Sequence, residues 1–391
     1  MEFGWPPELE AFRGAIKLFI DEWRTPELLA EVAAQGHGSQ RAGPCVKAVI
    51  DELDRRGWLR KSWPIEDGGE GASPWYRFIL AHELRHAGIP FSRGTASMLA
   101  PTISRFGTEE QKRYYVPRLW SGEISCALGY SEPDAGTDLA SLKTRATRDG
   151  DDYIINGQKI WTSGAHSSSH VWLATRTDPE APKHRGISVF IVPLDSPGIT
   201  IRPIWVMSGM RTNEVFYENV RVPGSARIGE ENRGWYIVAN ALDHERVTVG
   251  IDDMIDLIQL WDDLIAFLRS EHPEKLEDDV VARQLAELKR DLRVHRALLL
   301  ANACIVARGE TPTMQASMVK IWGSELRHRL SDVAMDLLGR YGALSNESGS
   351  LSPMAGRVEA TFRYAPVVRF AGGTNEIQRD IIARRGLGLP R

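Results

Sequence analysis

The spacing of apolar positions along the chain changes character twice. Residues 7–123 place apolar side chains at the three- and four-residue intervals of helices, whereas residues 124–230 place them in short alternating runs typical of strands. From Gly234 onward the helical spacing returns in longer segments. The pattern predicts an α+β protein with a helical domain at 1–123, a β domain at 124–232 and a second helical domain at 233–391.

Two local signals refine these elements. The run Thr-Glu-Glu-Gln that starts at Thr108 predicts a capping box with an acidic first turn, so we expect a helix to begin there. Asn156 and Gly157 lie between the strand-like segments 153–155 and 158–161, and this dipeptide is the strongest short signal for a hairpin. We therefore expect a tight turn at Asn156-Gly157.

Composition and charge exclude several classes of protein. The net charge of −4 over 391 residues lacks the basic excess that nucleic-acid binding requires. Cys45, Cys126 and Cys304 are far apart and lack the paired spacing of a zinc site, so we expect no metal. No run of 18 apolar residues and no secretory leader is visible, so we expect a cytoplasmic protein without a membrane span.

The segment 370–379 has the composition of a ligand-binding turn. Gly372 and Gly373 allow a ligand to approach the backbone closely, and Thr374 is a suitable N-cap for the helix that follows. A helix N-terminus offers N–H groups to an anionic or carbonyl oxygen. The two glycines supply no side chain that could move a proton, so any base must come from elsewhere in the chain.

A glutamate in the third region is a candidate for that base. On a helix, Glu245 shares one narrow face with Val238, Leu242 and Val249. A carboxylate centred on an apolar stripe needs a partner or a function. Structural ion pairs outnumber catalytic carboxylates, so these residues alone favour an ion pair, and a catalytic base is the alternative.

Several motifs together point to a known family. Taken singly, residues 126–141 read as a loop after a strand, and residues 161–164 as a turn that closes a hairpin. Taken together and in their order along the chain, these motifs make the chain resemble the flavin-dependent acyl-CoA dehydrogenase family over essentially its whole length. The matching segments are FGTEEQK (106–112), GYSEPDAGTD (129–138), NGQKIWTSGA (156–165), FYENVRVP (216–223) and GTNEIQR (373–379). The resemblance implies an N-terminal helical domain, a central β-barrel domain and a C-terminal four-helix bundle.

The resemblance also implies a cofactor, a substrate and site residues. The cofactor would be FAD, and the substrate an acyl-CoA thioester that is oxidised to the 2,3-enoyl-CoA. The implied contacts are Ser131, Trp161 and Ser163 with the flavin ring, Thr374 and Glu376 with the FAD tail, and Thr137, Arg246 and Gly372 with the acyl-CoA. Both serines stand where the family often has threonine, a change that keeps the hydroxyl.

The position of the base departs from most of the family. In most members it is a glutamate directly before the final Gly-Thr, where this chain has Gly372. A smaller branch places it on a bundle helix before an arginine, as in Glu245-Arg246 here. The resemblance thus implies that Glu245 removes the α-proton and that the β-hydrogen passes as hydride to flavin N5. Arg246 would orient the site, and the Gly372 N–H would stabilise the developing enolate. Apolar surroundings would raise the pKa of Glu245 toward that of a general base.

Two further departures concern assembly. Homotetrameric members carry an Arg-x-Phe-Gly motif and a Gln-x-x-Gly-Gly-x-Gly turn that contact a neighbour's FAD. Residues 275–284 contain no such motif, and Asp336 stands in place of the glutamine. This combination is similar to actinobacterial heterotetramers that act on CoA thioesters of cholesterol side chains or rings.

We therefore expect this chain to be the base-bearing subunit of a heterotetramer with a homologous partner. The alternatives are a homotetrameric, isovaleryl-like dehydrogenase of short branched acyl-CoA and a non-catalytic acyl-CoA-binding subunit. By resemblance alone, the electron acceptor would be an electron-transferring flavoprotein.

Overall fold

The computed structural model describes residues 5–35, 43–63, 65, 68–90, 95–310 and 312–390, and gives only the backbone of 33–35, 243–250 and 252. The chain forms two compact units. Unit 1 combines Met1–Glu22, Gly71–Ile89 and Arg246–Arg391, and unit 2 combines Trp23–Glu70 and Pro90–Glu245. These units combine segments that are separate in the sequence, whereas the domains expected at 1–123, 124–232 and 233–391 are continuous segments. The expected boundaries at 123 and 232 stay predictions.

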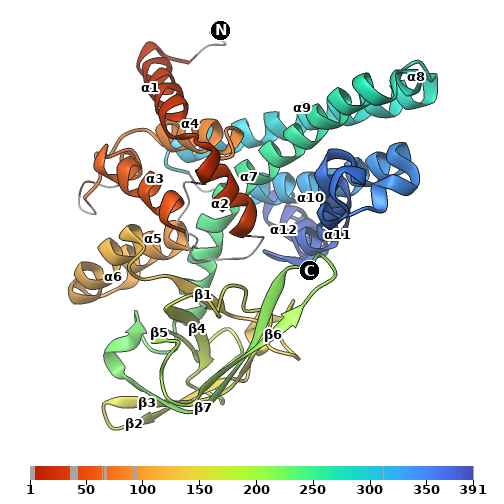
Figure 1. The fold of residues 1–391 in the computed structure, drawn as a ribbon. Coiled ribbons are helices and arrows are strands. Elements are labelled where there is room, and N and C mark those ends of the chain that lie inside the picture. Colours follow the sequence, from red (N-terminus) through yellow and green to blue (C-terminus); the bar gives the residue numbers. More distant parts are fainter. Residues whose placement is uncertain are drawn as a thin grey trace. The chain divides into compact units, whose positions relative to one another are not determined.

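The predicted order of helical, β and helical regions is confirmed (Figure 1). The helices are α1 (Pro7–Trp23), α2 (Pro26–Gln35), α3 (Pro44–Arg55), α4 (Trp75–His86), α5 (Ala96–Phe106), α6 (Glu109–Ser121), α7 (Gly234–Glu271), α8 (Pro273–Leu276), α9 (Asp279–Ala307), α10 (Thr313–Leu338), α11 (Arg357–Phe370) and α12 (Asn375–Ile381). Short 3-10 turns are η2 (Leu139–Ser141), η3 (Gly224–Ala226), η4 (Gly339–Ala343), η5 (Asn346–Leu351) and η6 (Pro353–Gly356), and a π turn, η7 (Ile382–Gly386), follows α12.

Helix α6 begins as its sequence predicts. The Thr108 hydroxyl accepts a hydrogen bond from the Gln111 N–H at 3.2 Å, and the Gln111 side chain accepts from the Thr108 N–H at 2.9 Å. Both ends of the capping box are therefore satisfied. The same glutamine donates to the carbonyls of Ser225 and Arg227, which ties the start of α6 to the end of the sheet.

The strands of unit 2 form one sheet with the order β6-β7-β3-β2-β4-β5-β8, and β1 pairs with β4 outside this path. Most neighbours are antiparallel, but β1 and β2 run parallel to β4. The strands are β1 (Cys126–Gly129), β2 (Arg145–Asp149), β3 (Asp152–Lys159), β4 (His170–Arg176), β5 (Ile187–Pro193), β6 (Ile199–Trp205), β7 (Arg211–Pro223) and β8 (Arg227–Ile228).

Both faces of the central strands are buried. Trp172 on β4 belongs to a cluster that also holds residues of α5, α6 and the first turns of α7, including Leu99, Leu119 and Val238. Leu173, the next residue of β4, belongs to a second cluster formed by the sheet itself. Successive side chains of a strand point to opposite faces, so β4 contributes to two cores at once.

The prediction of a hairpin turn at Asn156-Gly157 is wrong. Both residues lie inside β3, and the pairing with β7 shifts between Ile155 and Gly157, which marks a β-bulge. The Asn156 side chain bonds Asn219 on β7 from both ends, accepting from its N–H at 2.8 Å and donating to its Oδ1 at 3.2 Å. Gly157 has φ 148°, and a Cβ there would lie 2.7 Å from Thr144 Cα. The dipeptide thus forms a β-bulge, and its glycine allows β3 to lie close to the backbone of Thr144.

The tight turn before β3 lies five residues upstream of that bulge. Asp149 pairs with Asp152, which leaves Gly150 and Asp151 as a two-residue loop. Gly150 has φ 65°, a value that glycine adopts at little cost. A Gly-Asp loop therefore makes this hairpin.

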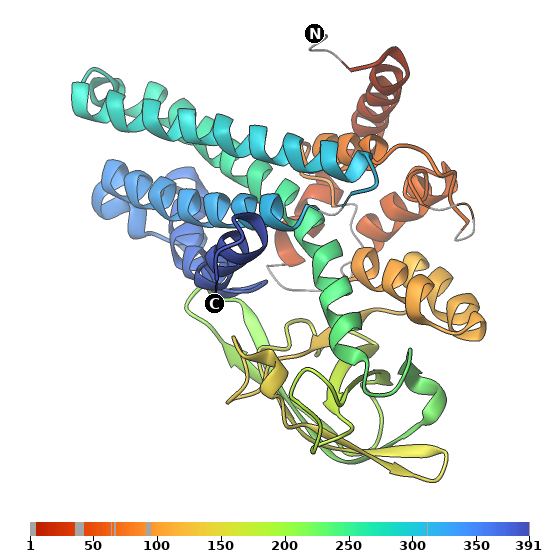
Figure 2. The ribbon, with the colours of Figure 1, turned by 180° about the vertical axis from the view of Figure 1, so that it is seen from behind.

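The C-terminal part of unit 1 is a bundle of α7, α9, α10 and α11 (Figure 2). Its apolar core takes residues from all four helices, among them Leu264, Leu288, Leu330 and Val358. Helix α12 packs on α10 beside this core. Among the described residues, no helix is both long and apolar enough to cross a membrane.

Candidate functional site

Trp161, which follows β3, is an exposed aromatic residue on a fixed backbone. Its φ is 60°, unusual for a residue other than glycine, and it is 54% exposed. The Ile160 N–H donates to the Ser131 carbonyl at 2.9 Å, and the Ser163 N–H donates to the Trp161 carbonyl at 2.9 Å. The structure therefore brings Ser131, Trp161 and Ser163 together, and their expected contact with a flavin stays a prediction.

Strand β7 supports this segment from the other side. The Thr162 N–H donates to the Asn213 carbonyl at 3.0 Å, and the buried Asn213 amide returns a bond to the Thr162 carbonyl at 2.9 Å. The Ser163 hydroxyl donates to the Thr212 hydroxyl at 3.2 Å. A strained conformation persists where its surroundings over-determine it, and these bonds do so for Trp161.

A buried ion pair lies behind the Ser131 loop. Lys159, fully buried at the end of β3, donates to Glu132 Oε1 at 2.8 Å and to the Tyr130 carbonyl at 2.9 Å. Glu132, only 7% exposed, also accepts from the N–H groups of Lys143 at 2.6 Å and Thr144 at 2.8 Å. The pair thus anchors the residues on both sides of Ser131.

The pKa values of the pair fit two charged groups at neutral pH. Burial lowers the pKa of Lys159 to about 8, although the Glu132 charge opposes this shift. Burial also opposes ionisation of Glu132, but the charge of Lys159 and the hydrogen bonds hold the pKa of Glu132 below its usual value. Sequence reasoning missed this pair. The available signal was a lysine on the buried alternation of Tyr153 and Ile155.

Thr137 lies on the exposed part of the loop that follows Ser131. The loop closes on itself where Glu132 and Ala135 bridge, and Asp138 next to Thr137 forms an ion pair with Lys183 at 2.7 Å. This arrangement leaves the Thr137 side chain at the surface of unit 2.

The glycine turn lies in unit 1, between α11 and α12. Gly372 and Gly373 have φ values of 66° and 89°, which glycine tolerates and other residues rarely do. The Thr374 hydroxyl accepts from the Ile377 N–H at 3.3 Å, so the predicted N-cap is confirmed. Gln378 donates to the carbonyls of Gly372 at 3.0 Å and Gly373 at 3.4 Å.

Glu376 stands in the first turn of α12 with its side chain exposed. Hydrogen bonds from its own N–H and from the Thr374 hydroxyl lower its pKa, so it is a carboxylate at a helix N-terminus. Arg369 approaches it at 4.0 Å.

Glu245 and Arg246 lie on α7, but their side chains fall outside the described residues. Earlier on that helix, Val238 is 2% exposed, and Leu242 packs against the same apolar cluster. The stripe that leads to Glu245 is therefore a buried one, and the role of Glu245 itself stays a prediction.

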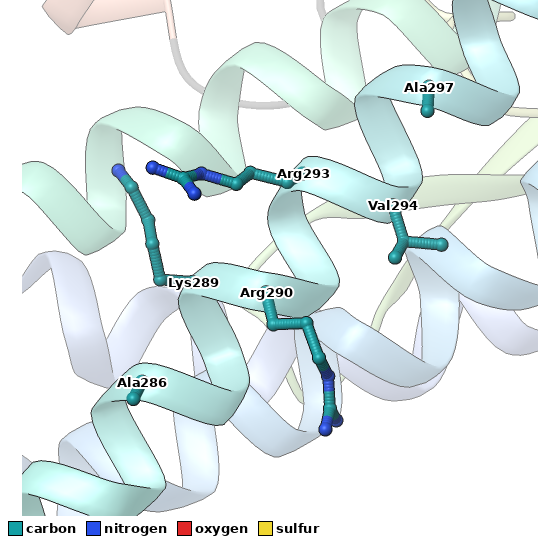
Figure 3. A pocket seen from close by; sticks show the side chains of 6 residues that line it. All are labelled: Ala286, Lys289, Arg290, Arg293, Val294 and Ala297. Atoms are coloured by element: carbon teal, nitrogen blue, oxygen red, sulfur yellow. The ribbon is translucent and has the colours of Figure 1, made fainter.

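A surface hollow of about 530 Å³ runs along α9 (Figure 3). It is lined by Ala286, Lys289, Arg290, Arg293, Val294 and Ala297, none of which was predicted to bind cofactor or substrate. In the part of the chain that the structure describes, no group of three or more metal-ligating side chains is found.

Comparisons with known proteins match this organisation region by region. The N-terminal, middle and C-terminal domain models of the acyl-CoA dehydrogenases match residues 6–123, 127–220 and 232–387. The chain belongs to the acyl-CoA dehydrogenase family, whose members are FAD-dependent oxidoreductases that act on acyl-CoA.

Similar proteins come from mycobacteria and from solved heteromeric complexes. The acyl-CoA dehydrogenase FadE26 of Mycobacterium tuberculosis is 38% identical over 402 residues, covering 100% of this chain and 99% of that protein. The structure titled Tcur3481-Tcur3483 steroid ACAD has a TM-score of 0.88 at 39% identity, with 100% of both chains covered. The ChsE4-ChsE5 complex from Mycobacterium tuberculosis has a TM-score of 0.87 at 36% identity, also with full coverage.

Proposed function

We propose that this chain introduces a 2,3 double bond into an acyl-CoA thioester, with Glu245 as the base that removes the α-proton. The observation that carries the proposal is the turn at Gly372, where a left-handed backbone stands in place of an acidic side chain. The buried stripe of α7 that reaches Leu242 supports a base one turn further on, at Glu245. A carboxylate in apolar surroundings has a raised pKa suited to this task.

The cofactor would be held by three residues near the end of β3 and by two at the start of α12. The exposed indole of Trp161 offers a flat apolar surface that fits a flavin ring. The Ser131 carbonyl accepts a hydrogen bond from the preceding residue, Ile160, and the Ser163 N–H donates to the Trp161 carbonyl. Thr374 and Glu376 would contact the FAD tail. When bound, FAD supplies the acceptor for the β-hydride.

The acyl-CoA would be held by backbone and side-chain groups of this chain. Thr137 would contact the CoA portion, and Arg246 would orient the site. The Gly372 N–H would donate to the thioester carbonyl. Such a donor stabilises the negative charge that develops on that oxygen, which is the largest single term in many enzymes.

We further propose that the chain works as one subunit of a heterotetramer with a homologous partner. The first support is the start of α9, near which homotetrameric relatives carry a motif that binds a neighbour's FAD. Here Asp278 caps the helix and accepts from the N–H groups of Val280 at 2.8 Å and Val281 at 3.1 Å. A helix N-terminus that is filled by its own carboxylate does not attract a pyrophosphate.

The end of α10 gives a second support. Lys275 donates a hydrogen bond to the Leu337 carbonyl, so the α8 segment and the end of α10 lie together. Asp336 is exposed beside that contact, and Glu277, Asp278 and Asp279 are exposed just beyond Lys275. Like charges repel, so this acidic surface is unsuited to a pyrophosphate.

The relatives narrow the proposed substrate. The similar solved structures are a complex titled a steroid ACAD and the ChsE4-ChsE5 complex, so we propose a steroid CoA ester, derived from cholesterol, as substrate. An electron-transferring flavoprotein is the proposed acceptor. The competing proposals are an isovaleryl-like homotetramer and a non-catalytic acyl-CoA-binding subunit.

One experiment tests both parts of the proposal. The chain is expressed alone and together with candidate homologous partners, and each preparation is measured for bound flavin, mass and dehydrogenation of a panel of acyl-CoA esters. We expect full flavin content and activity only with a partner. A fully flavinated, active homotetramer of this chain alone would contradict the heteromeric assembly.

The base is tested in the active complex. Glu245→Gln should lower kcat by roughly 10²–10⁴-fold, the range of general-base catalysis, while flavin content is unchanged. Glu271→Gln, an exposed carboxylate at the end of the same helix, is the matched control. Full activity of Glu245→Gln would remove the assignment of the base and leave the non-catalytic alternative.

A further inference from the structure

One face of α10 carries three polar side chains that are turned toward α12. Ser317, Lys320 and Ser324 are spaced three and four residues apart, so they share a side of the helix. Ser317 and Ser324 are buried, and Lys320 is partly buried. Polar groups in such places need partners. Each serine also donates to a carbonyl within α10, of Thr313 or of Ile321. The described partners outside α10 belong to the glycine turn or to its two flanking helices.

The contacts on α12 are made by two buried amides. The Ser317 hydroxyl donates to Gln378 Oε1 at 2.8 Å. Lys320 Nζ donates to Asn375 Oδ1 at 2.7 Å, and the Asn375 amide donates to the Ser324 hydroxyl at 2.9 Å. Asn375 and Gln378 are both 0% exposed and lie on one side of α12, three residues apart. The first turn of α12 is therefore fastened to α10 at two levels.

The same groups reach the glycine turn itself. Gln378 Nε2 donates to the carbonyls of Gly372 and Gly373, and a Cβ on Gly373 would lie 2.8 Å from that nitrogen. Lys320 Nζ also donates to the Arg369 carbonyl at 2.8 Å, near the end of α11. One ammonium thus joins the segment that enters the turn to the helix that leaves it.

We propose that Lys320 and Gln378 are positioning residues, which hold the Gly372-Gly373 turn so that its N–H groups are fixed before the thioester carbonyl arrives. The proposal rests on the proposed function for the use of that N–H. Two flexible glycines at positive φ otherwise have many accessible conformations, and a catalytic donor that is displaced by about 1 Å can cost up to about 100-fold in rate.

The charge state of Lys320 gives the proposal a pH signature. Burial lowers the pKa of Lys320 to about 8, and the charges that act on it are Glu376 and Asp253, which favour the ammonium, and Arg369 and Arg379, which oppose it. Above about pH 8 the amine loses its positive charge, which weakens its hydrogen bonds to both acceptors. Activity should therefore show a limb near pH 8 that depends on this lysine.

The test compares Lys320→Met and Gln378→Met with Trp322→Phe in the holoenzyme. Trp322 is also on α10 and donates to the Asp291 carbonyl at 3.0 Å, so its variant also loses an interhelical hydrogen bond, but away from the turn. Amide hydrogen exchange of residues 371–377 is measured first, because it does not depend on activity. We expect at least 10-fold faster exchange in the two turn variants and no change in Trp322→Phe.

Steady-state kinetics then test the use of the turn. We expect kcat to fall about 10–100-fold with a smaller change in KM, and the limb near pH 8 to be lost in Lys320→Met. Unchanged amide exchange in the turn variants would overturn the proposal that Lys320 and Gln378 hold the turn. Faster exchange with a kcat equal to that of Trp322→Phe would overturn the role of the held turn in catalysis.

A milder variant covers poor folding. Ser317→Ala removes the bond to Gln378 Oε1 together with a bond to the Thr313 carbonyl within α10. Ser331→Ala removes a buried hydroxyl that bonds the His328 carbonyl within α10 at 2.9 Å, so it is the matched control for the bond inside the helix. Faster exchange of the turn is expected in Ser317→Ala alone, and equal exchange in both would overturn the proposal. If Glu245→Gln kept full activity, the proposed function would fail. The exchange results would still decide whether Lys320 and Gln378 hold the turn.

Discussion

Replacing Lys159 by methionine is the sharpest test of how unit 2 holds the Ser131 loop. The change removes an ammonium that is fully buried and keeps a side chain of similar length. Among the described residues, Glu132 is 7% exposed and then keeps two backbone N–H donors but no ion-pair partner in place of Lys159, which lies at 2.8 Å. Breaking a buried pair by removing one partner costs about 3–5 kcal/mol.

That cost converts into a measurable temperature shift. For a unit of roughly 200 residues, each kcal/mol shifts Tm by about 2–4 °C, so we expect the transition of unit 2 to fall by roughly 6–20 °C. Because the pair also bonds the Tyr130 carbonyl, we expect flavin to be lost at a lower temperature as well. Calorimetry and the release of flavin fluorescence on heating measure the two effects.

The double variant Glu132→Gln with Lys159→Met provides the control. Removing both charges relieves the uncompensated carboxylate, so the double variant should be less destabilised than the sum of the single variants by at least about 1 kcal/mol. Additive effects, or a loss below about 1 kcal/mol in Lys159→Met, would refute the interpretation of this pair as a coupled anchor.

Two further outcomes follow from the sheet and from the buried lysine. Gly157→Ala should destabilise the protein by about 1–3 kcal/mol in chemical denaturation, because φ is 148° and the added Cβ would meet Thr144. Gly14→Ala lies within α1 with nothing near its Cβ, so it should stabilise the protein by about 0.5–1 kcal/mol. Equal effects of the two substitutions would contradict this reasoning. The pKa of Lys159 is about 8 in the folded chain against its ordinary value of 10.5, so the unfolded chain binds more protons between these values and stability should rise with pH across that window. The rise, up to about 1.4 kcal/mol per pH unit, should be smaller in Lys159→Met, and equal slopes in the two proteins would argue against it.

Local patterns predicted the elements well, because each depends on neighbours in the sequence. The capping box at Thr108 and the N-cap at Thr374 are set within one helical turn, and both form as expected. The Asn156-Gly157 turn failed because its conformation is decided by β7, more than 50 residues away, whose Asn219 bonds the asparagine. Sequence spacing does not report such partners.

The same distinction applies to the site. The motifs selected Ser131, Trp161 and Ser163 as flavin contacts; the structure brings the three residues together, and their contact with a flavin stays a prediction. The motifs did not predict Lys159, because the burial of a lysine depends on where Glu132 is placed in the fold. Gln378 and Lys320 were missed for a related reason, since their contacts are made between helices rather than along one.

The carboxylate of Asp278 has a consequence for how such a chain could change over evolutionary time. With the first N–H groups of α9 already bonded by a residue of the same helix, the insertion of an arginine nearby would not by itself create a place for a phosphate. The aspartate would have to be lost in the same lineage, and until then the new arginine would bring no benefit. A dependence on a second subunit that is reinforced in this way is easier to keep than to reverse.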